Sequence, residues 1–161
     1  LMIVGIPNVG KSSFINRMAQ SKKAKVEDRP GVTRTKQWVK IGDQMELLDM
    51  PGVLWPKFDD QEVAKRLAFT GAIKDDIMDL ESLAMLLLEF LAERYPKALE
   101  ARYKMQVSDA DSGLQLLEQL GRKRGMLISG GEVNYERAAI TVLDEFRSGT
   151  LGRLTLELPE A

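Results

Sequence analysis

Residues 5–12 read Gly5-Ile6-Pro7-Asn8-Val9-Gly10-Lys11-Ser12 and directly follow an apolar run at residues 1–4. This stretch matches G-x-x-x-x-G-K-[ST], the phosphate-binding loop that joins a strand to a helix. The two glycines let the backbone curl so that successive N–H groups point at an anion. The helix that begins near Lys11 adds the positive end of its dipole to the same place. The stretch therefore predicts a site for the phosphates of a nucleoside triphosphate.

The residue types in this loop set the expected contacts. Lys11 would reach the β- and γ-phosphates, and the Ser12 hydroxyl would be a ligand of Mg²⁺. A glycine-flanked turn without a ligand is the alternative, and the uninterrupted, correctly flanked match counts against it. The residues expected to contact the nucleotide are those of the loop and the next turn, with one glycine further along: Asn8, Val9, Gly10, Lys11, Ser12, Ser13 and Gly52.

Composition limits the chemistry that the 161 residues can perform. The chain has no cysteine and no histidine, which excludes thiolate metal sites and imidazole acid–base catalysis. No apolar stretch reaches the length of a membrane span and no signal peptide is visible, so we expect a cytoplasmic protein. Residues 1–58 hold 10 Lys/Arg and 5 Asp/Glu, whereas residues 59–161 hold 13 and 19. The basic first part suits a phosphate ligand or an RNA backbone.

The order of the predicted elements indicates an α/β region followed by helices. A strand at residues 1–4, a helix at 13–18 and a hairpin of 37–41 and 45–50 precede a helix at 60–72. A long helix is expected from residue 80, with Asp79 as its N-cap and Pro96 beyond its end. Two more helices are expected at 112–120, stopped by Gly121, and at 134–146, before a short strand at 154–158. A boundary near residues 73–79 divides the chain into residues 1–75 and 76–161.

Two further motifs distinguish GTPases from other proteins with a phosphate-binding loop. Thr33, in Pro30-Gly-Val-Thr-Arg34, lies where a switch loop offers a threonine to Mg²⁺ and the γ-phosphate. Asp49, in Asp49-Met-Pro-Gly52, follows an apolar strand, where it would hold Mg²⁺ through water while the Gly52 N–H contacts the γ-phosphate. Each motif alone is compatible with a simple turn, but their order behind the loop is typical of GTPase switches. The expected catalytic residues are Lys11, Thr33 and Gly52, and the expected metal ligands are Ser12, Thr33 and Asp49.

Three segments of the chain resemble a known family. Gly5-Ile-Pro-Asn-Val-Gly-Lys-Ser-Ser-Phe-Ile-Asn16, Pro30-Gly-Val-Thr-Arg34 and Leu48-Asp-Met-Pro-Gly-Val-Leu-Trp-Pro56 are similar to the circularly permuted GTPases of the YlqF type, the ribosome biogenesis GTPase A family. The resemblance implies an α/β fold, part of a P-loop GTPase domain with a parallel or mixed sheet, followed by a small helical domain. Residues 1–75 would be the phosphate-binding and switch half of the permuted domain, and residues 76–161 a helical domain that binds RNA or the ribosome.

The same resemblance implies a function. The chain would belong to a GTP-binding and GTP-hydrolysing assembly factor for the large ribosomal subunit, with GTP or GDP and Mg²⁺ as cofactors. Arg122, Lys123 and Arg124 form a basic cluster that follows a predicted helix. Cations that complement the helix dipole are one explanation of this cluster, and the resemblance favours contact with ribosomal RNA.

The chain departs from the family pattern in one place, and in a second place it departs from the common GTPase pattern, where the family is similar in having a hydrophobic residue. Asn-Lys-x-Asp, which reads the guanine base and precedes the phosphate loop in this family, is absent. Because the chain also begins inside its first strand, we expect a fragment that lacks the guanine-specificity part and binds the nucleotide weakly or is inactive alone. Val53 follows Gly52, where GTPases commonly place a water-orienting glutamine. Water would then be positioned by an upstream segment, a monovalent cation near Asn8 or a partner, and hydrolysis would be slow and stimulated by the ribosome.

Two other functions remain open at this stage. A P-loop ATPase or kinase-type phosphotransferase would need a lid and an acceptor pocket, and the sequence shows neither clearly. A non-catalytic RNA-binding module with a vestigial nucleotide site is the second alternative. The intact residues Lys11, Ser12 and Asp49 count against the vestigial site.

Overall fold

The computed structural model describes residues 1–20, 33, 35–41, 45–54, 60–75, 79–108 and 110–158. Residues 30–32 and 34 of the predicted switch loop lie outside this set, as do Trp55 and Pro56. The chain divides into two compact units, Leu1–Lys74 and Asp75–Ala161. In the described part of the chain, no helix combines the length and the apolar character that a membrane span needs.

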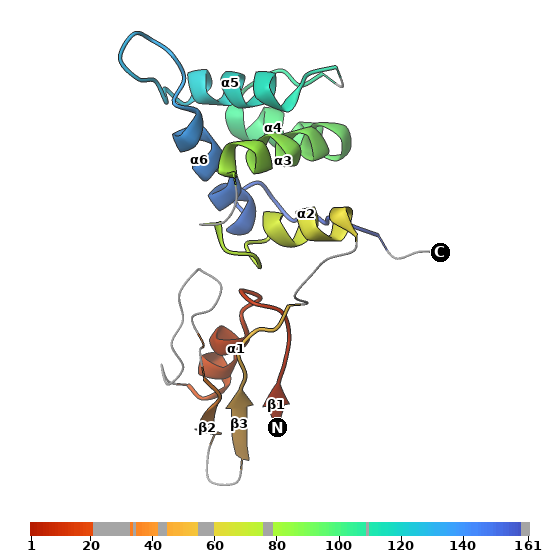
Figure 1. The fold of residues 1–161 in the computed structure, drawn as a ribbon, viewed down its shortest axis with the longest axis vertical. Helices are drawn as coiled ribbons and strands as arrows, with labels where there is room; N and C mark the ends of the chain where they lie inside the picture. The colour runs from red at the N-terminus through yellow and green to blue at the C-terminus, as the bar shows by residue number, and fades with distance from the viewer. Residues whose placement is uncertain are drawn as a thin grey trace. The chain divides into compact units, whose positions relative to one another are not determined.

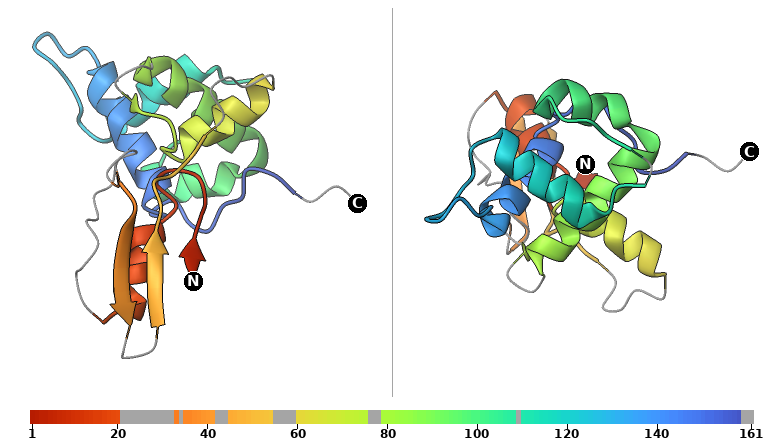
Figure 2. Two further views of the ribbon diagram at one scale, coloured as in Figure 1. Left: turned by 60° about the horizontal axis from the view of Figure 1, so that its bottom comes forward. Right: turned by 90° about the horizontal axis from the view of Figure 1, so that it is seen from above.

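The first unit contains a three-stranded mixed sheet with the strand order β1-β3-β2 (Figure 1). β1 (Met2–Ile3) runs parallel to β3 (Met45–Asp49), and β2 (Gln37–Ile41) runs antiparallel to β3. α1 (Lys11–Met18) packs on one face of the sheet (Figure 2). Ile15, Val39 and Leu47 form a buried cluster there. α2 (Gln61–Phe69) follows and is capped by the Asp60 carboxylate. The mixed sheet with its covering helix confirms the predicted α/β class.

The second unit is helical throughout its described elements. α3 (Leu80–Arg94) packs against α4 (Pro96–Tyr103), α5 (Gly113–Lys123) and α6 (Tyr135–Arg147), as Figure 1 shows. The side chains of Asp79, Ser112 and Asn134 accept backbone N–H groups at the starts of α3, α5 and α6. The core is aliphatic, and its fully buried side chains include Leu87, Leu88, Leu91, Leu99, Leu116, Leu117, Leu120 and Val142.

In the second unit, one helix is not predicted by the sequence and two predictions are wrong. No helix is predicted directly after residue 95, yet α4 begins at Pro96, because the first turn of a helix does not need the N–H that proline lacks. Gly121 does not stop α5, which continues to Lys123; an added Cβ at Gly121 would collide with Val133, so glycine serves close packing here. Residues 154–158 form no strand. The Tyr95 hydroxyl instead donates a hydrogen bond to Thr155 O at 3.0 Å.

Gly113 tests the close packing of α3 on α5. An added Cβ at Gly113 would lie 2.5 Å from the Met85 carbonyl oxygen, and the Gly113 N–H already donates to Glu89 at 2.8 Å. Gly113→Ala is therefore expected to push α5 away from α3 and to lower the free energy of unfolding by about 1–3 kcal/mol. Leu114→Ala is the control, because this side chain is 48% exposed and its loss should change the free energy by less than about 0.5 kcal/mol. Guanidinium denaturation followed by circular dichroism measures both, and equal effects would contradict the packing argument.

Candidate phosphate-binding site

The loop between β1 and α1 has the backbone conformation that an anion site requires. Gly10, at the start of α1, has a φ of 87°, and Asn8 also adopts a left-handed conformation with a φ of 57°. Helices α2, α3, α5 and α6 each begin with a capping side chain, whereas none of the described side chains caps α1. The first N–H groups of α1 are therefore left to face a ligand in the loop.

The Lys11 ammonium is held inside this loop. Its Nζ donates a hydrogen bond to the Ile6 carbonyl oxygen at 2.6 Å. Burial lowers the pKa of Lys11 from its ordinary value, while the Asp49 carboxylate acts in the opposite direction. The ammonium and the loop N–H groups can therefore meet the same anion. The other predicted contact residues of this segment, Asn8, Val9, Gly10, Ser12 and Ser13, follow one another along the loop and the first turn of α1.

The structure brings together the three predicted metal ligands. Ser12 Oγ donates to Asp49 Oδ2 at 2.7 Å and lies 3.0 Å from Thr33 Oγ1. The three residues come from α1, from the chain between α1 and β2, and from the end of β3. Asp49 reaches this position because β3 runs parallel to β1, with Asp49 in register with Ile3 just before the loop. The Asp49 carboxylate therefore lies next to the phosphate loop, at the carboxyl ends of β1 and β3, where ligands bind in α/β sheets.

Asp49 shows why this cluster fits a divalent cation. Its side chain is 1% exposed, and its buried Oδ1 has no hydrogen-bond partner among the described residues. A buried polar atom without a partner destabilises a fold by about 1–3 kcal/mol, and more when it is charged. A carboxylate and two hydroxyls are hard oxygen ligands of the kind that Mg²⁺ prefers. Among the described residues, no group of three His, Cys, Asp or Glu side chains is placed so that it could hold a metal ion.

Gly52 lies directly against the phosphate loop. An added Cβ at Gly52 would collide with backbone atoms of Pro7 and would lie 2.9 Å from the Ile6 carbonyl carbon. The sequence does not predict this contact, because neither the loop motif at residues 5–12 nor the Asp49-Met-Pro-Gly52 motif indicates which residues of the other it contacts. Val53, the next residue, is 72% exposed, and its aliphatic side chain cannot hydrogen-bond water.

The basic cluster Arg122–Arg124 begins inside α5, not after it. Arg122 and Lys123 belong to the last turn, and Arg124 is the C-cap. The Arg122 guanidinium pairs with Glu118 at 2.8 Å, and the Arg124 guanidinium pairs with Glu145 at 2.6 Å. Glu145 also binds Arg102, whose hydrogen bond lowers the pKa of the Glu145 carboxyl from its ordinary value. Carboxylates thus neutralise two of the three cations that the sequence proposes for RNA contact.

The chain matches a protein family and several known proteins over most of its length. A family model described as 50S ribosome-binding GTPase matches residues 1–119. Ribosome biogenesis GTPase A of Bacillus cereus is 50% identical over 159 residues, which are 99% of this chain and 53% of that protein. The chain thus spans about half the length of the curated relatives it matches.

Two solved structures resemble the whole chain at 27% sequence identity. The GDP-bound structure of TM YlqF has a TM-score of 0.69, with 99% of this chain and 60% of that chain covered. GNP-bound YlqF from T. maritima has a TM-score of 0.62, with 99% and 59% covered. Both structures support the fold of a phosphate-binding α/β region followed by helices.

Gly52→Ala tests the contact between Gly52 and the phosphate loop. The new methyl group would collide with the backbone of Pro7, so we expect the free energy of unfolding to fall by about 1–3 kcal/mol. The amide hydrogens of residues 5–12 should also exchange faster, because the loop loses its contact. Val53→Ala is the matched control, since Val53 is 72% exposed. Urea denaturation and hydrogen exchange measure these effects, and a Gly52→Ala protein as stable and as protected as the Val53→Ala protein would refute the contact.

Proposed function

Because the chain belongs to the 50S ribosome-binding GTPase family, we propose that it forms part of a GTP-hydrolysing factor that assists assembly of the large ribosomal subunit in the cytoplasm. The hydrogen-bonded group of Ser12, Thr33 and Asp49 behind the phosphate loop carries this proposal. Kinases and other ATPases share the loop, but this combination with a switch threonine and Asp49-Met-Pro-Gly52 is typical of GTPases. The relatives are named ribosome biogenesis GTPase A, which points to the same activity in those proteins.

The residues of the site divide into groups that bind phosphate and groups that hold the metal. Asn8, Val9, Gly10 and Ser13 would present loop and helix N–H groups to the phosphates of GTP or GDP, and Lys11 would neutralise charge on the β- and γ-phosphates. Gly52 would offer its N–H to the γ-phosphate from the position it occupies beside Pro7. A GTP molecule would thus bind both the loop and the Gly52 segment, whereas GDP would leave the contact with Gly52 unmade.

Ser12, Thr33 and Asp49 would hold Mg²⁺. Ser12 and Thr33 would offer hydroxyl oxygens, and the buried Asp49 Oδ1 would gain the partner that the described residues do not provide. When bound, the ion would supply positive charge beside the phosphate oxygens. Thr33 lies in the segment between α1 and β2, the predicted switch loop. Because switch loops are ordered by contacts with the γ-phosphate and Mg²⁺, the position of Thr33 would depend on whether the γ-phosphate is present.

The group that activates water lies outside the site as described. Val53 stands where a glutamine would orient the attacking water, and its aliphatic side chain cannot do so. We propose that Lys11, the loop N–H groups and the metal stabilise the charge of the transition state, while water is positioned by a monovalent cation near Asn8, by another part of the protein or by the ribosome. Hydrolysis by the chain alone would then be slow and would accelerate on the ribosome.

The proposal assigns different tasks to the two parts of the chain. Residues 1–75 would be the phosphate-binding and switch half of a circularly permuted GTPase domain, and residues 76–161 would contact the ribosome and its RNA. Lys123 is the member of the α5 basic cluster for which the described structure shows no ion pair, and Arg122 and Arg124 would have to leave Glu118 and Glu145 to bind phosphate. Contact with RNA through this cluster would therefore require two ion pairs to open.

Lys11→Ala and Asp49→Asn separate phosphate binding from metal binding. Lys11→Ala removes a charged donor to the phosphates, so its affinity for fluorescently labelled GDP should fall by at least about tenfold, with or without Mg²⁺. Asp49→Asn should lose the gain in affinity that Mg²⁺ gives the unchanged protein, while its affinity in EDTA stays the same. Arg17→Ala, at an exposed position in the last turn of α1, is the control and should match the unchanged protein.

Titrations into the millimolar range, with Mg²⁺ or with EDTA, distinguish these outcomes. Affinity unaffected by Lys11→Ala would show that the loop does not hold the phosphates. Phosphate transferred from the nucleotide to an acceptor other than water would favour the kinase-type alternative.

A further inference from the structure

We propose that β2 presents a binding surface for unpaired RNA, formed by Lys36, Trp38 and Lys40, which we call the β2 stripe. This inference rests on the proposed ribosomal function and names the surface of the first unit that would contact RNA. Trp38 is 62% exposed, which is unusual for the largest apolar side chain. It is not part of the phosphate site, so the exposure needs a separate explanation.

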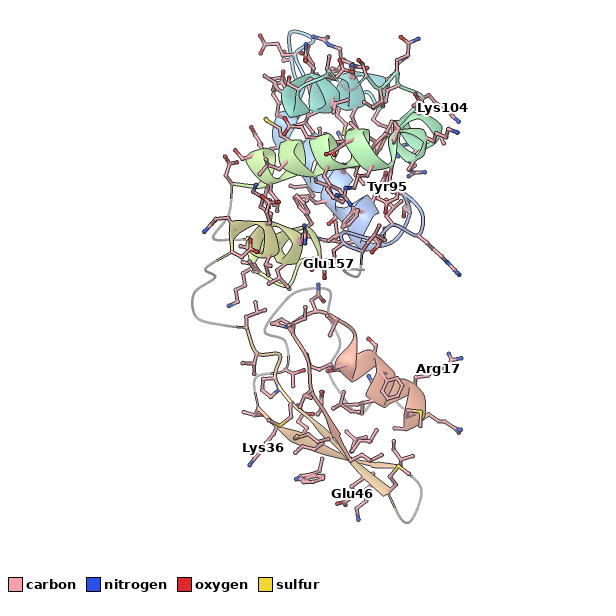
Figure 3. The ribbon with its side chains drawn as sticks, turned by 90° about the vertical axis from the view of Figure 1, so that its right-hand side faces the viewer. Arg17, Lys36, Glu46, Tyr95, Lys104 and Glu157 are labelled. Atoms are coloured by element: carbon pink, nitrogen blue, oxygen red, sulfur yellow. The ribbon has the colours of Figure 1, made fainter. Side chains whose placement is uncertain are left out.

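The pleat of β2 (Gln37–Ile41) places Trp38 and Lys40 on the face of the sheet opposite α1. Val39 is buried in the cluster that α1 covers, and Ile41 packs against the same cluster. Side chains alternate between the two faces of a strand, so Trp38 and Lys40 point away from α1. Lys36, two residues before Trp38, is also exposed (Figure 3). An aromatic ring thus lies between two lysines along one extended segment.

An apolar row continues from Trp38 across the sheet. Trp38 is in register with Leu48 of β3, which is in register with Met2 of β1. Leu48 is half-buried, and Met2 is 59% exposed. The row offers a flat apolar surface beside the indole ring, of the kind on which nucleobases stack in sheet-based RNA-binding domains.

The two lysines make RNA a better occupant than another protein element. A helix packed over Trp38 would also cover Lys36 and Lys40, and moving two ammonium groups out of water is unfavourable. A nucleotide strand would place a base on Trp38 and its phosphates beside the lysines. The Lys40 side chain is 77% exposed, although it approaches Glu46 to 4.0 Å, and exposed ion pairs of this kind contribute little to stability.

The position of β2 at the edge of the described sheet does not explain the tryptophan. Lysines on an edge strand commonly prevent one sheet from pairing with another. An exposed tryptophan works against that protection, because it offers an incoming strand a large apolar side chain. The lysines alone would fit a simple edge strand, whereas the combination with Trp38 fits a surface that binds an anionic, aromatic ligand.

The charge of the two units favours the same location. Leu1–Lys74 contains 13 Lys/Arg and 8 Asp/Glu, a net charge of +5, whereas Asp75–Ala161 contains 10 and 16, a net charge of −6. RNA is held largely through its phosphates, so the basic unit attracts it more strongly than the acidic unit, where contact would depend on local clusters of cations. The cations of the second unit at Arg122 and Arg124 are moreover paired with carboxylates.

Trp38 can report its own contact with RNA. The chain has two tryptophans, so Trp55→Phe leaves Trp38 as the single indole fluorophore. In that background, a single-stranded adenosine 12-mer should quench the fluorescence to saturation, and a 12-base-pair RNA duplex should quench it far less, because its bases are already stacked. Binding of the same labelled RNA to variants of the unchanged chain is then followed by anisotropy.

The variants test stacking and charge separately. Trp38→Ala should weaken binding of the 12-mer by at least about fivefold, while Trp38→Phe should keep most of the affinity because the ring can still stack. Lys36→Ala and Lys40→Ala should each reduce the slope of log affinity against log salt by about 0.7. Lys97→Ala, at an exposed position on α4, is the matched control and should leave the slope unchanged.

Unchanged RNA affinity in Trp38→Ala overturns the proposal, as does equal quenching by single-stranded and duplex RNA. Self-association of the chain that Trp38→Ala abolishes also overturns it, because the stripe would then be a protein interface. Titration of labelled GDP on the same samples keeps the two proposals apart. A chain that binds GDP through Lys11 but has no Trp38-dependent RNA binding refutes the stripe alone. A chain that binds no nucleotide refutes the proposed function.

Discussion

The hydrogen bond from Ser12 Oγ to Asp49 Oδ2 joins the two halves of the first unit and brings its functional groups together. Ser12 belongs to the helix that follows the phosphate loop, and Asp49 ends the strand that pairs with both other strands. Asp49 is almost fully buried, so its carboxylate stays in place only if polar partners meet it there. Ser12 Oγ donates to Asp49 Oδ2, and Asp49 Oδ1 has no hydrogen-bond partner among the described residues. The site thus contains a buried carboxylate whose negative charge a cation would neutralise, which fits the proposed site for a metal and a phosphate.

Much of this arrangement follows from local signals in the sequence. The loop pattern specifies its own backbone, because Gly10 and the residues around it determine where α1 begins. The order of loop, Thr33 and Asp49 predicts a cluster, and the parallel pairing of β1 with β3 explains why the cluster forms. Asp79 and Asn134 likewise mark helix starts, since short polar side chains before an apolar stripe cap the first turn.

The features that sequence reasoning missed depend on contacts between distant residues. Glycine usually ends a helix, but Gly121 remains inside α5 because Val133 packs where a side chain would be. The approach of Gly52 to Pro7 is invisible in either motif, although it connects the switch segment to the loop. The sequence also does not show that Glu118 and Glu145 pair with two cations of the basic cluster at the end of α5. The alternation of side chains along β2 places Trp38 and Val39 on opposite faces of the sheet. Whether the Trp38 side chain is exposed depends on what covers its face, which local sequence does not indicate.

A crystal structure of the chain with a non-hydrolysable GTP analogue and Mg²⁺ tests the central claim most directly. The claim is that Ser12, Thr33 and Asp49 form a metal site completed by the phosphates. We expect the ion within about 2.0–2.1 Å of Ser12 Oγ, the phosphates in the loop beside Lys11, and Asp49 Oδ1 linked to the ion directly or through one water. An ion bound elsewhere, or phosphates outside the loop with the Ser12–Asp49 hydrogen bond unchanged, would contradict the account.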